Sequence, residues 1–100
     1  MYLVQILLPL TAPADRRRLH QFDKIKRELT AKFGGMTFYR SAPAEGLWQE
    51  TDDVEEDLVV TAEIMAAELE RDWWAQYRKR LEQDLAQKEI VVRSFKIERL

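Results

Sequence analysis

The sequence predicts an α+β fold: a βαββαβ ferredoxin-like sandwich with a four-stranded antiparallel sheet and two helices on one face. Two observations predict it. Strand-like and helix-like stretches follow one another in the order β, α, β, β, α, β, and the 100 residues are enough for one domain spanning 1–100. Each β–α–β unit needs a right-handed crossover, so both helices return over the same side of the sheet.

The first half of the chain supplies a strand, a helix and a stop signal. Residues 2–8 are rich in strand-forming side chains and end at Pro9. A helix is expected over about 14–33, and Gly34 and Gly35 supply its end. Its apolar stripe recurs at helical spacing through Leu19, Phe22, Ile25, Leu29 and Phe33.

The second half supplies a hairpin, a helix and a last strand. Strands are expected over 36–42 and 57–65, joined by a long polar connection. The second of these strands alternates, with an apolar face of Leu58, Val60, Ala62 and Ile64. A helix over about 68–87 follows, and 90–100 form the last strand. The stripe of that helix is Trp74, Tyr77, Leu81 and Leu85.

Composition excludes several function classes. There is no cysteine, which removes disulfides and thiolate sites and favours a reducing compartment, so we expect a cytoplasmic protein. The net charge of −2 gives no reason to expect nucleic acid, and no apolar run approaches the length of a membrane span. The apolar start of the chain lacks a preceding Lys or Arg, so we interpret it as a strand and not as a signal peptide.

The face of the sheet without helices is too apolar to stay wet. In an isolated sandwich this face should be polar. Here the alternation assigns to it Leu3, Gln5, Leu7, Thr37, Tyr39, Val59, Thr61, Glu63 and Met65, with Val91, Arg93, Phe95 and Ile97 from the last strand. An apolar patch of this kind is usually an interface or a ligand groove. The simplest cover is a second copy about a two-fold axis, so we expect a homodimer.

In this pattern and length the whole chain resembles the dimeric α+β barrel superfamily. In that superfamily two ferredoxin-like domains close their sheets into one barrel, often around a small-molecule cavity. The stretch from Ala44 to Trp48, followed by Asp72, Trp73 and Trp74, also resembles small bacterial proteins with no assigned activity. The resemblance therefore implies a fold and a dimer, and it carries over no functional residues.

Four polar side chains of the helix-free face are candidate ligand-binding residues: Gln5, Tyr39, Glu63 and Arg93. Buried charge is costly unless it is paired. One interpretation is a structural Glu63–Arg93 pair that fixes the register of the dimer. The other is a small-molecule site in which Glu63 acts as a base or acceptor and Arg93 as an anion clamp.

The remaining candidates each have a simpler interpretation beside the functional one. Trp48 and Trp73 either line a ligand groove or pack in the core or an interface. His20, the single histidine, is expected on the exposed side of its helix, without a catalytic partner. The run Arg16–Arg18 is an anion site or a solvated charge run. The acidic stretch 50–57 lacks the glycine-centred loop of a calcium motif, so we expect no metal and no cofactor.

Two function hypotheses follow. In the first, the chain is a dimeric small-molecule-binding protein or a small cofactor-independent enzyme. In the second, it is a non-catalytic structural or protein-interaction domain whose sheet face only forms the dimer. Other uses of the fold lack their residues: an RNA-recognition sheet needs stacking aromatics on its central strands, and residues 57–65 have none. Whether the protein is an enzyme stays open at this point.

Overall fold

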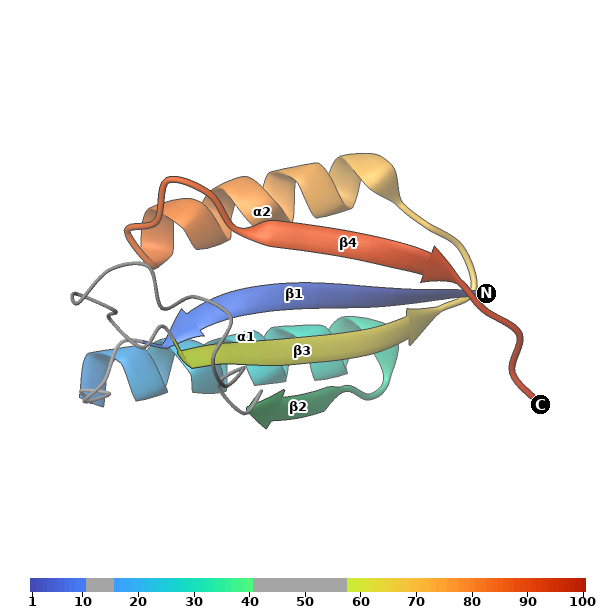
Figure 1. Ribbon diagram of the computed structural model, residues 1–100, viewed down its shortest axis with the longest axis horizontal. Helices are drawn as coiled ribbons and strands as arrows, with labels where there is room; N and C mark the ends of the chain where they lie inside the picture. Colours follow the sequence, from blue (N-terminus) through green and yellow to red (C-terminus); the bar gives the residue numbers. More distant parts are fainter. Residues whose placement is uncertain (11–15, 41–57) are drawn as a thin grey trace, which may run out of the picture.

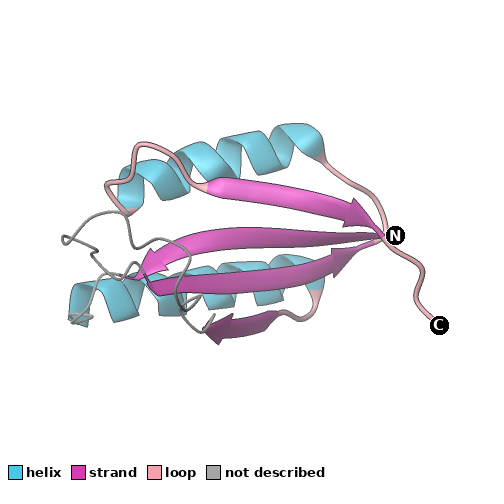
Figure 2. Cartoon of the chain, in the orientation of Figure 1, coloured by secondary structure: helices cyan, strands magenta, loops and turns pink. Residues whose placement is uncertain are grey.

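A computed structural model describes residues 1–10, 16–40 and 58–100, and it confirms the predicted fold class (Figure 1). Four strands form one antiparallel sheet, and two helices lie together on one side of it (Figures 1 and 2). The elements are β1 (Tyr2–Leu10), α1 (Arg16–Phe33), β2 (Thr37–Arg40), β3 (Leu58–Ala66), α2 (Arg71–Asp84) and β4 (Val91–Lys96).

The sheet has the order β2-β3-β1-β4, so the two long strands β1 and β3 are central. β1 pairs antiparallel with both β3 and β4. The register places Gln5 directly between Glu63 of β3 and Arg93 of β4. Directly opposite residues share one face of an antiparallel sheet. The three polar side chains therefore lie in one line across the strands.

β1 continues past Pro9, where the sequence predicts its end. Pro9 lies opposite Val59 in the ladder with β3, whereas β4 pairs with β1 only as far as Leu7. Ile97 N–H donates to the Met1 carbonyl, 3.0 Å away, so the odd-numbered residues of β1 direct their main-chain groups toward β4. The nitrogen of Pro9 thus points to a side with no paired strand, and no ladder bond is lost.

The core lies between the sheet and the helices, and the predicted stripes fill it. Alternate residues of β1 and β3 face the helices, and both helices bury apolar side chains against them. Almost wholly buried are Val4, Ile6, Leu8, Val60, Ala62 and Ile64 from the sheet, and Phe22, Ile25, Leu29, Trp74, Tyr77, Leu81 and Leu85 from the helices and the end of α2.

Leu19 is the exception, because the structure leaves its side chain 48% exposed. Counted at 100° per residue, Leu19 lies about 85° from the middle of the Phe22, Ile25 and Leu29 stripe. Arg18 lies closer to that direction and is half-buried. Its guanidinium donates to the carbonyl of Leu85, with both terminal nitrogens at 3.4 Å. The first turn of α1 therefore meets the end of α2 through a polar contact and not through Leu19.

The two helices end by different means. Gly34 has φ +81° and its N–H donates to the Thr30 carbonyl at 2.8 Å, which confirms the predicted stop. α2 ends at Asp84, three residues before the predicted end, although no glycine follows. Ala86 takes the left-handed conformation (φ +52°) and donates to the Gln83 carbonyl, while Gln87 N–H donates to the Glu82 carbonyl. This is a Schellman motif with alanine in the usual glycine position.

The remaining boundaries differ by a few residues. β2 begins at Thr37, one residue later than expected, and β3 ends at Ala66, one residue later than expected. Residues 41, 42 and 57 of the expected strands lie outside the described residues. β4 ends at Lys96, where the prediction ran to residue 100. No helix in the described ranges is both long and apolar enough to cross a membrane.

An aromatic cluster fills the core under α2. Trp73 stacks on Tyr77, with ring centroids 4.8 Å apart, and Phe33 stacks on Trp74 at 5.4 Å. Within the described residues, the Tyr77 hydroxyl and the Trp74 indole nitrogen are buried without a hydrogen-bond partner. Burial, with a smaller contribution from the negative charge of Asp84, raises the pKa of Tyr77 to about 12.

Tyr77 should make the protein sensitive to strong alkali. Its pKa in the folded chain lies above the ordinary value of 10, so its contribution to stability is complete below pH 10 and is lost between pH 10 and 12. Two pH units correspond to roughly 2–3 kcal/mol. Relative to Tyr77→Phe, the wild type should lose that much unfolding free energy across this window, measured by urea unfolding. Tyr2→Phe is the matched control and should lose as much unfolding free energy between pH 10 and 12 as the wild type. If the unfolding free energies of the wild type and Tyr77→Phe fell equally with pH, the raised pKa of Tyr77 would be refuted.

Candidate functional site

The candidate site lies on the helix-free face of the sheet, the face turned toward the viewer in Figure 1. Register places Leu3 between Met65 and Phe95, and Leu7 beside Val91. Met65, Val91 and Phe95 keep 50%, 44% and 45% of their surface exposed. The predicted apolar face is therefore present, and large apolar side chains on it meet solvent in the single chain.

A polar relay crosses the middle of this face. Gln5 donates from Nε2 to Oε1 of Glu63 at 2.6 Å, and its own Oε1 accepts from Nε of Arg93 at 2.7 Å. The Gln5 amide thus joins a cation on β4 to a carboxylate on β3. The Glu63–Arg93 pair considered from the sequence is indirect, because the strand of Gln5 runs between the two.

The Arg93 guanidinium has donors left over. Its Nε is used by Gln5, and its carbon Cζ lies 5.7 Å from the centre of the Phe95 ring. Arg93 forms no ion pair with a residue of the described ranges. The side chain is exposed, so its terminal nitrogens are available to an anion outside the chain.

The other predicted site residues do not join this relay. The backbone of Tyr39 lies opposite Thr61 in the β2–β3 ladder, on the same face as Glu63, but its side chain is outside the described residues. Trp48 lies outside the described residues altogether. Trp73 lies on α2, on the opposite side of the sheet, where it packs against Phe33, Trp74 and Tyr77. Trp73 therefore has the core role that was its alternative interpretation.

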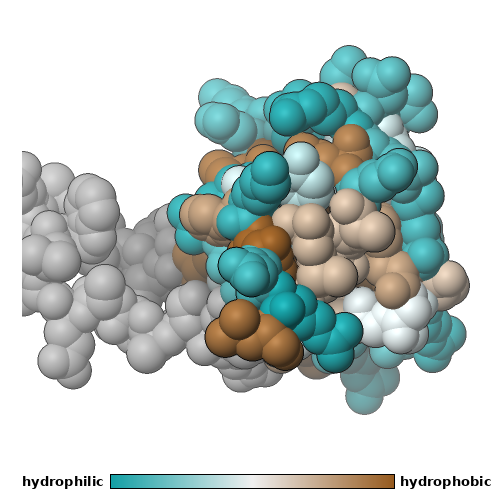
Figure 3. Space-filling view, turned by 90° about the vertical axis from the view of Figure 1, so that its right-hand side faces the viewer, coloured by the Kyte–Doolittle hydropathy of each residue, from teal (hydrophilic) through white to brown (hydrophobic). Residues whose placement is uncertain are grey.

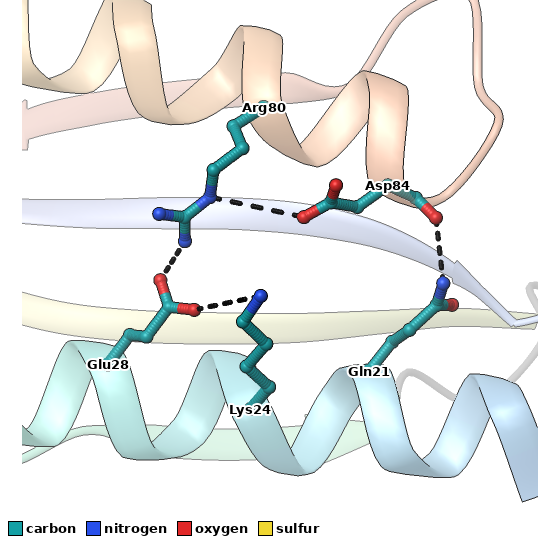
Figure 4. A network of polar contacts seen from close by, with 5 residues as sticks. All are labelled: Gln21, Lys24, Glu28, Arg80 and Asp84. Atoms are coloured by element: carbon teal, nitrogen blue, oxygen red, sulfur yellow. Dashed lines mark hydrogen bonds and ion pairs between the residues drawn. The ribbon is translucent and has the colours of Figure 1, made fainter.

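A second polar network, which the sequence interpretation missed, ties the helices together (Figure 4). Arg80 of α2 binds the Glu28 carboxylate of α1, and Lys24 approaches the same carboxylate at 4.0 Å. Gln21 donates to the main-chain carbonyl of Asp84 at 2.7 Å. The i,i+4 spacing within each helix is visible in the sequence. Which residues of α1 meet which residues of α2 depends on how the two helices pack, and this cannot be read from that spacing.

A groove runs between the helices beside this network. It has a volume of about 490 Å³, and Ile25 and Leu81 form part of its floor. His20 lies on its rim and is exposed, as predicted. The charges of Glu28 and Arg80 neutralise each other across the groove, which fits a contact that positions the helices. Of the basic run, Arg16 and Arg17 are exposed and solvated, whereas Arg18 caps the end of α2.

The end of the sheet where β1 begins has a mixed surface. Figure 3 looks onto this end and shows apolar residues in the centre, with polar residues around them. Met1 and Met65 are exposed here, at 41% and 50%. Met65 belongs also to the helix-free face, so the apolar surface continues from that face around the end of the sheet.

Neither a metal cluster nor a known relative identifies the site. In the parts of the chain that the structure describes, no group of three or more His, Cys, Asp or Glu side chains is placed to hold a metal ion. No family model, curated protein or solved structure matches the chain. The function is therefore argued from the geometry of the chain alone.

Proposed function

We propose that this protein acts as a homodimer that packs its helix-free sheet faces together and binds a small anionic molecule beside the Gln5 relay. The observation that carries the proposal is the line of Glu63, Gln5 and Arg93 across the centre of an otherwise apolar face. Large apolar side chains exposed around a charged centre are typical of an interaction site and not of the surface of a stable monomer.

A second copy is the cover best supported by the charges of this face. Glu63 lies on the β3 side of Gln5 and Arg93 on the β4 side. With a two-fold axis parallel to the strands, each Arg93 faces the partner's Glu63, and the contact repeats itself in both directions. An axis perpendicular to the strands would bring like charges together. The face is thus self-complementary in one arrangement only.

The chemistry of the relay supports an anionic ligand. The Gln5 amide is held at both ends, so it orients the Arg93 guanidinium without neutralising it. Guanidinium groups bind carboxylates and phosphates through paired hydrogen bonds. Enclosed between two sheets, such a contact is shielded from water and gains strength. A cavity of this kind is also what the dimeric α+β barrel superfamily implies.

Removing the Arg93 charge should abolish ligand binding, and it should also weaken the dimer, because each Arg93 faces the partner's Glu63. Binding is therefore compared at a protein concentration at which light scattering shows that the variant is still a dimer. A panel of small carboxylic acids is first screened on the wild type by thermal shift, since a ligand of the folded state raises Tm. A hit should lose its shift, with at least a roughly 10-fold weaker Kd, in Arg93→Gln. Arg99→Gln, which removes the same charge beyond β4, is the control. A hit that binds Arg93→Gln as tightly as the wild type would show that the relay is not the site.

The second candidate function is a dimer without a ligand. It is favoured by the hydrogen bonds of Gln5, whose amide oxygen and nitrogen are both used within the chain, as in a purely structural element. Glu63→Gln separates the two functions, since it keeps the shape and removes the charge. In a purely structural role the substitution weakens the dimer and leaves ligand binding otherwise intact, whereas in a ligand site it also abolishes the binding of a hit.

A further inference from the structure

A cleft lies on the helix side of the sheet, between the first half of α2 and β4. It has a volume of about 200 Å³ and is separate from the helix-free face. α2 forms one wall with Arg71, Trp74 and Arg78, and β4 forms the other with Val92 and Ser94. The side chain of Arg93 is held on the opposite face by Gln5, so Arg93 meets the cleft through its main chain.

The helical wall of the cleft carries two positive charges, those of Arg71 and Arg78. Positions 71, 74, 75 and 78 follow the i, i+3, i+4, i+7 spacing of a single helix face. Arg71 and Arg78 are two turns apart, which is about 10 Å along the helix axis. Long arginine side chains span such a distance toward a shared ligand, and Trp74, between them in the sequence, also lines the cleft.

Most donors of this wall lack acceptors among the described residues. Trp74 is 5% exposed, and its indole N–H has no partner in the described part of the chain. Arg71 forms no ion pair with any described residue. Within the described residues, Arg78 approaches only Glu82 as an acidic partner, at 3.7 Å. That carboxylate oxygen already accepts from the Ile90 N–H at 2.9 Å.

The strand wall adds a free main-chain edge. β4 is the last strand of the sheet on this side. Ile97 donates to Met1, so residues 91, 93 and 95 direct their main-chain groups to β1. The main-chain groups of Val92 and Ser94 therefore point away from β1, toward the cleft. The Ser94 N–H and its exposed hydroxyl supply two further donors.

We infer that this cleft binds a small dianion. Its helical wall carries two guanidinium groups, and the strand wall adds the donors of Ser94. At about 30 Å³ for each water-sized group, 200 Å³ holds roughly seven such groups. A short dicarboxylate or a small phosphate matches both the size and the charge. The inference is independent of the proposed function, because the cleft lies on the other side of the sheet.

Titration calorimetry with succinate and with inorganic phosphate tests the inference. At least one should bind with a Kd below about 1 mM. The indole N–H signal of Trp74 in a ¹⁵N–¹H spectrum should shift on binding, because Trp74 lines the cleft. Arg71→Gln and Arg78→Gln should each weaken binding at least about 10-fold. Lys79→Gln removes an equal charge from α2 outside the cleft and should leave Kd unchanged.

Each outcome decides the question. Binding of succinate alone identifies a dicarboxylate site, and binding of phosphate alone identifies a phosphate site. Absence of binding of both anions at 10 mM, or equal weakening by Lys79→Gln and Arg71→Gln, would overturn the inference. Arg71 is exposed, so its substitution leaves the core intact, and thermal unfolding of each variant verifies this. Anion binding in the cleft should also persist in Met65→Glu, the variant expected to be monomeric. An error in the proposed dimer can therefore be distinguished from an error in the proposed anion site.

Discussion

Leu81→Ala should lower the free energy of unfolding by about 2–5 kcal/mol. Leu81 lies on the buried stripe of α2 and is 1% exposed. Truncation removes apolar burial and leaves a cavity that the tightly packed surroundings fill only in part. Domains of this size have little stability to spare, so a loss of this magnitude is a large fraction of their total free energy of unfolding.

Urea unfolding at one fixed protein concentration measures the effect of Leu81→Ala. Gln76→Ala, at an exposed position of the same helix, is the matched control and should change stability by only a few tenths of a kcal/mol. A loss below about half a kcal/mol for Leu81→Ala would mean that α2 does not pack on the sheet as described.

Met65→Glu should dissociate the proposed dimer. Met65 lies on the helix-free face and is 50% exposed in the single chain, so a charge there costs little before assembly. Sheet-to-sheet packing would bury that charge without a partner, at a cost of about 3 kcal/mol or more. The dimer dissociation constant should therefore rise about 100-fold or more.

Leu19→Glu is the control for Met65→Glu. Leu19 is 48% exposed, so the two substitutions place the same charge at equally exposed apolar positions. They differ only in the surface that carries them, since Leu19 lies on α1. Sedimentation equilibrium over a dilution series should show a monomer for Met65→Glu and an unchanged dimer for Leu19→Glu. Equal behaviour of the two variants would remove the helix-free face from the interface.

The fold could be predicted because local patterns and topology agree. The period-two alternation around Ala62 assigns one face of β3 to the core, and that choice fixes the opposite face. Pairing order then follows from two crossovers of the same hand. The shared face of Gln5, Glu63 and Arg93 was thus accessible from the sequence.

What could not be predicted depends on contacts between distant segments. Pro9, which has no N–H to donate, is tolerated because β4 pairs with β1 only as far as Leu7, and no local pattern carries that information. Ala86 ends α2 in a conformation that its residue type does not favour. The link between Glu28 and Arg80 joins residues 52 positions apart. The hydrogen bonds of Gln5 could be recognised only from the strand register, which places Gln5 between Glu63 and Arg93. A direct pair between these two charges was one interpretation of the sequence.

The molar mass of the wild-type protein in solution tests the central claim most directly. Multi-angle light scattering at micromolar concentration reads it without a standard. A homodimer closed through the helix-free face should give about twice the 11.9 kDa of the single chain. A mass that stays at 11.9 kDa across the concentration range would contradict the dimer, and with it the enclosed site beside Gln5.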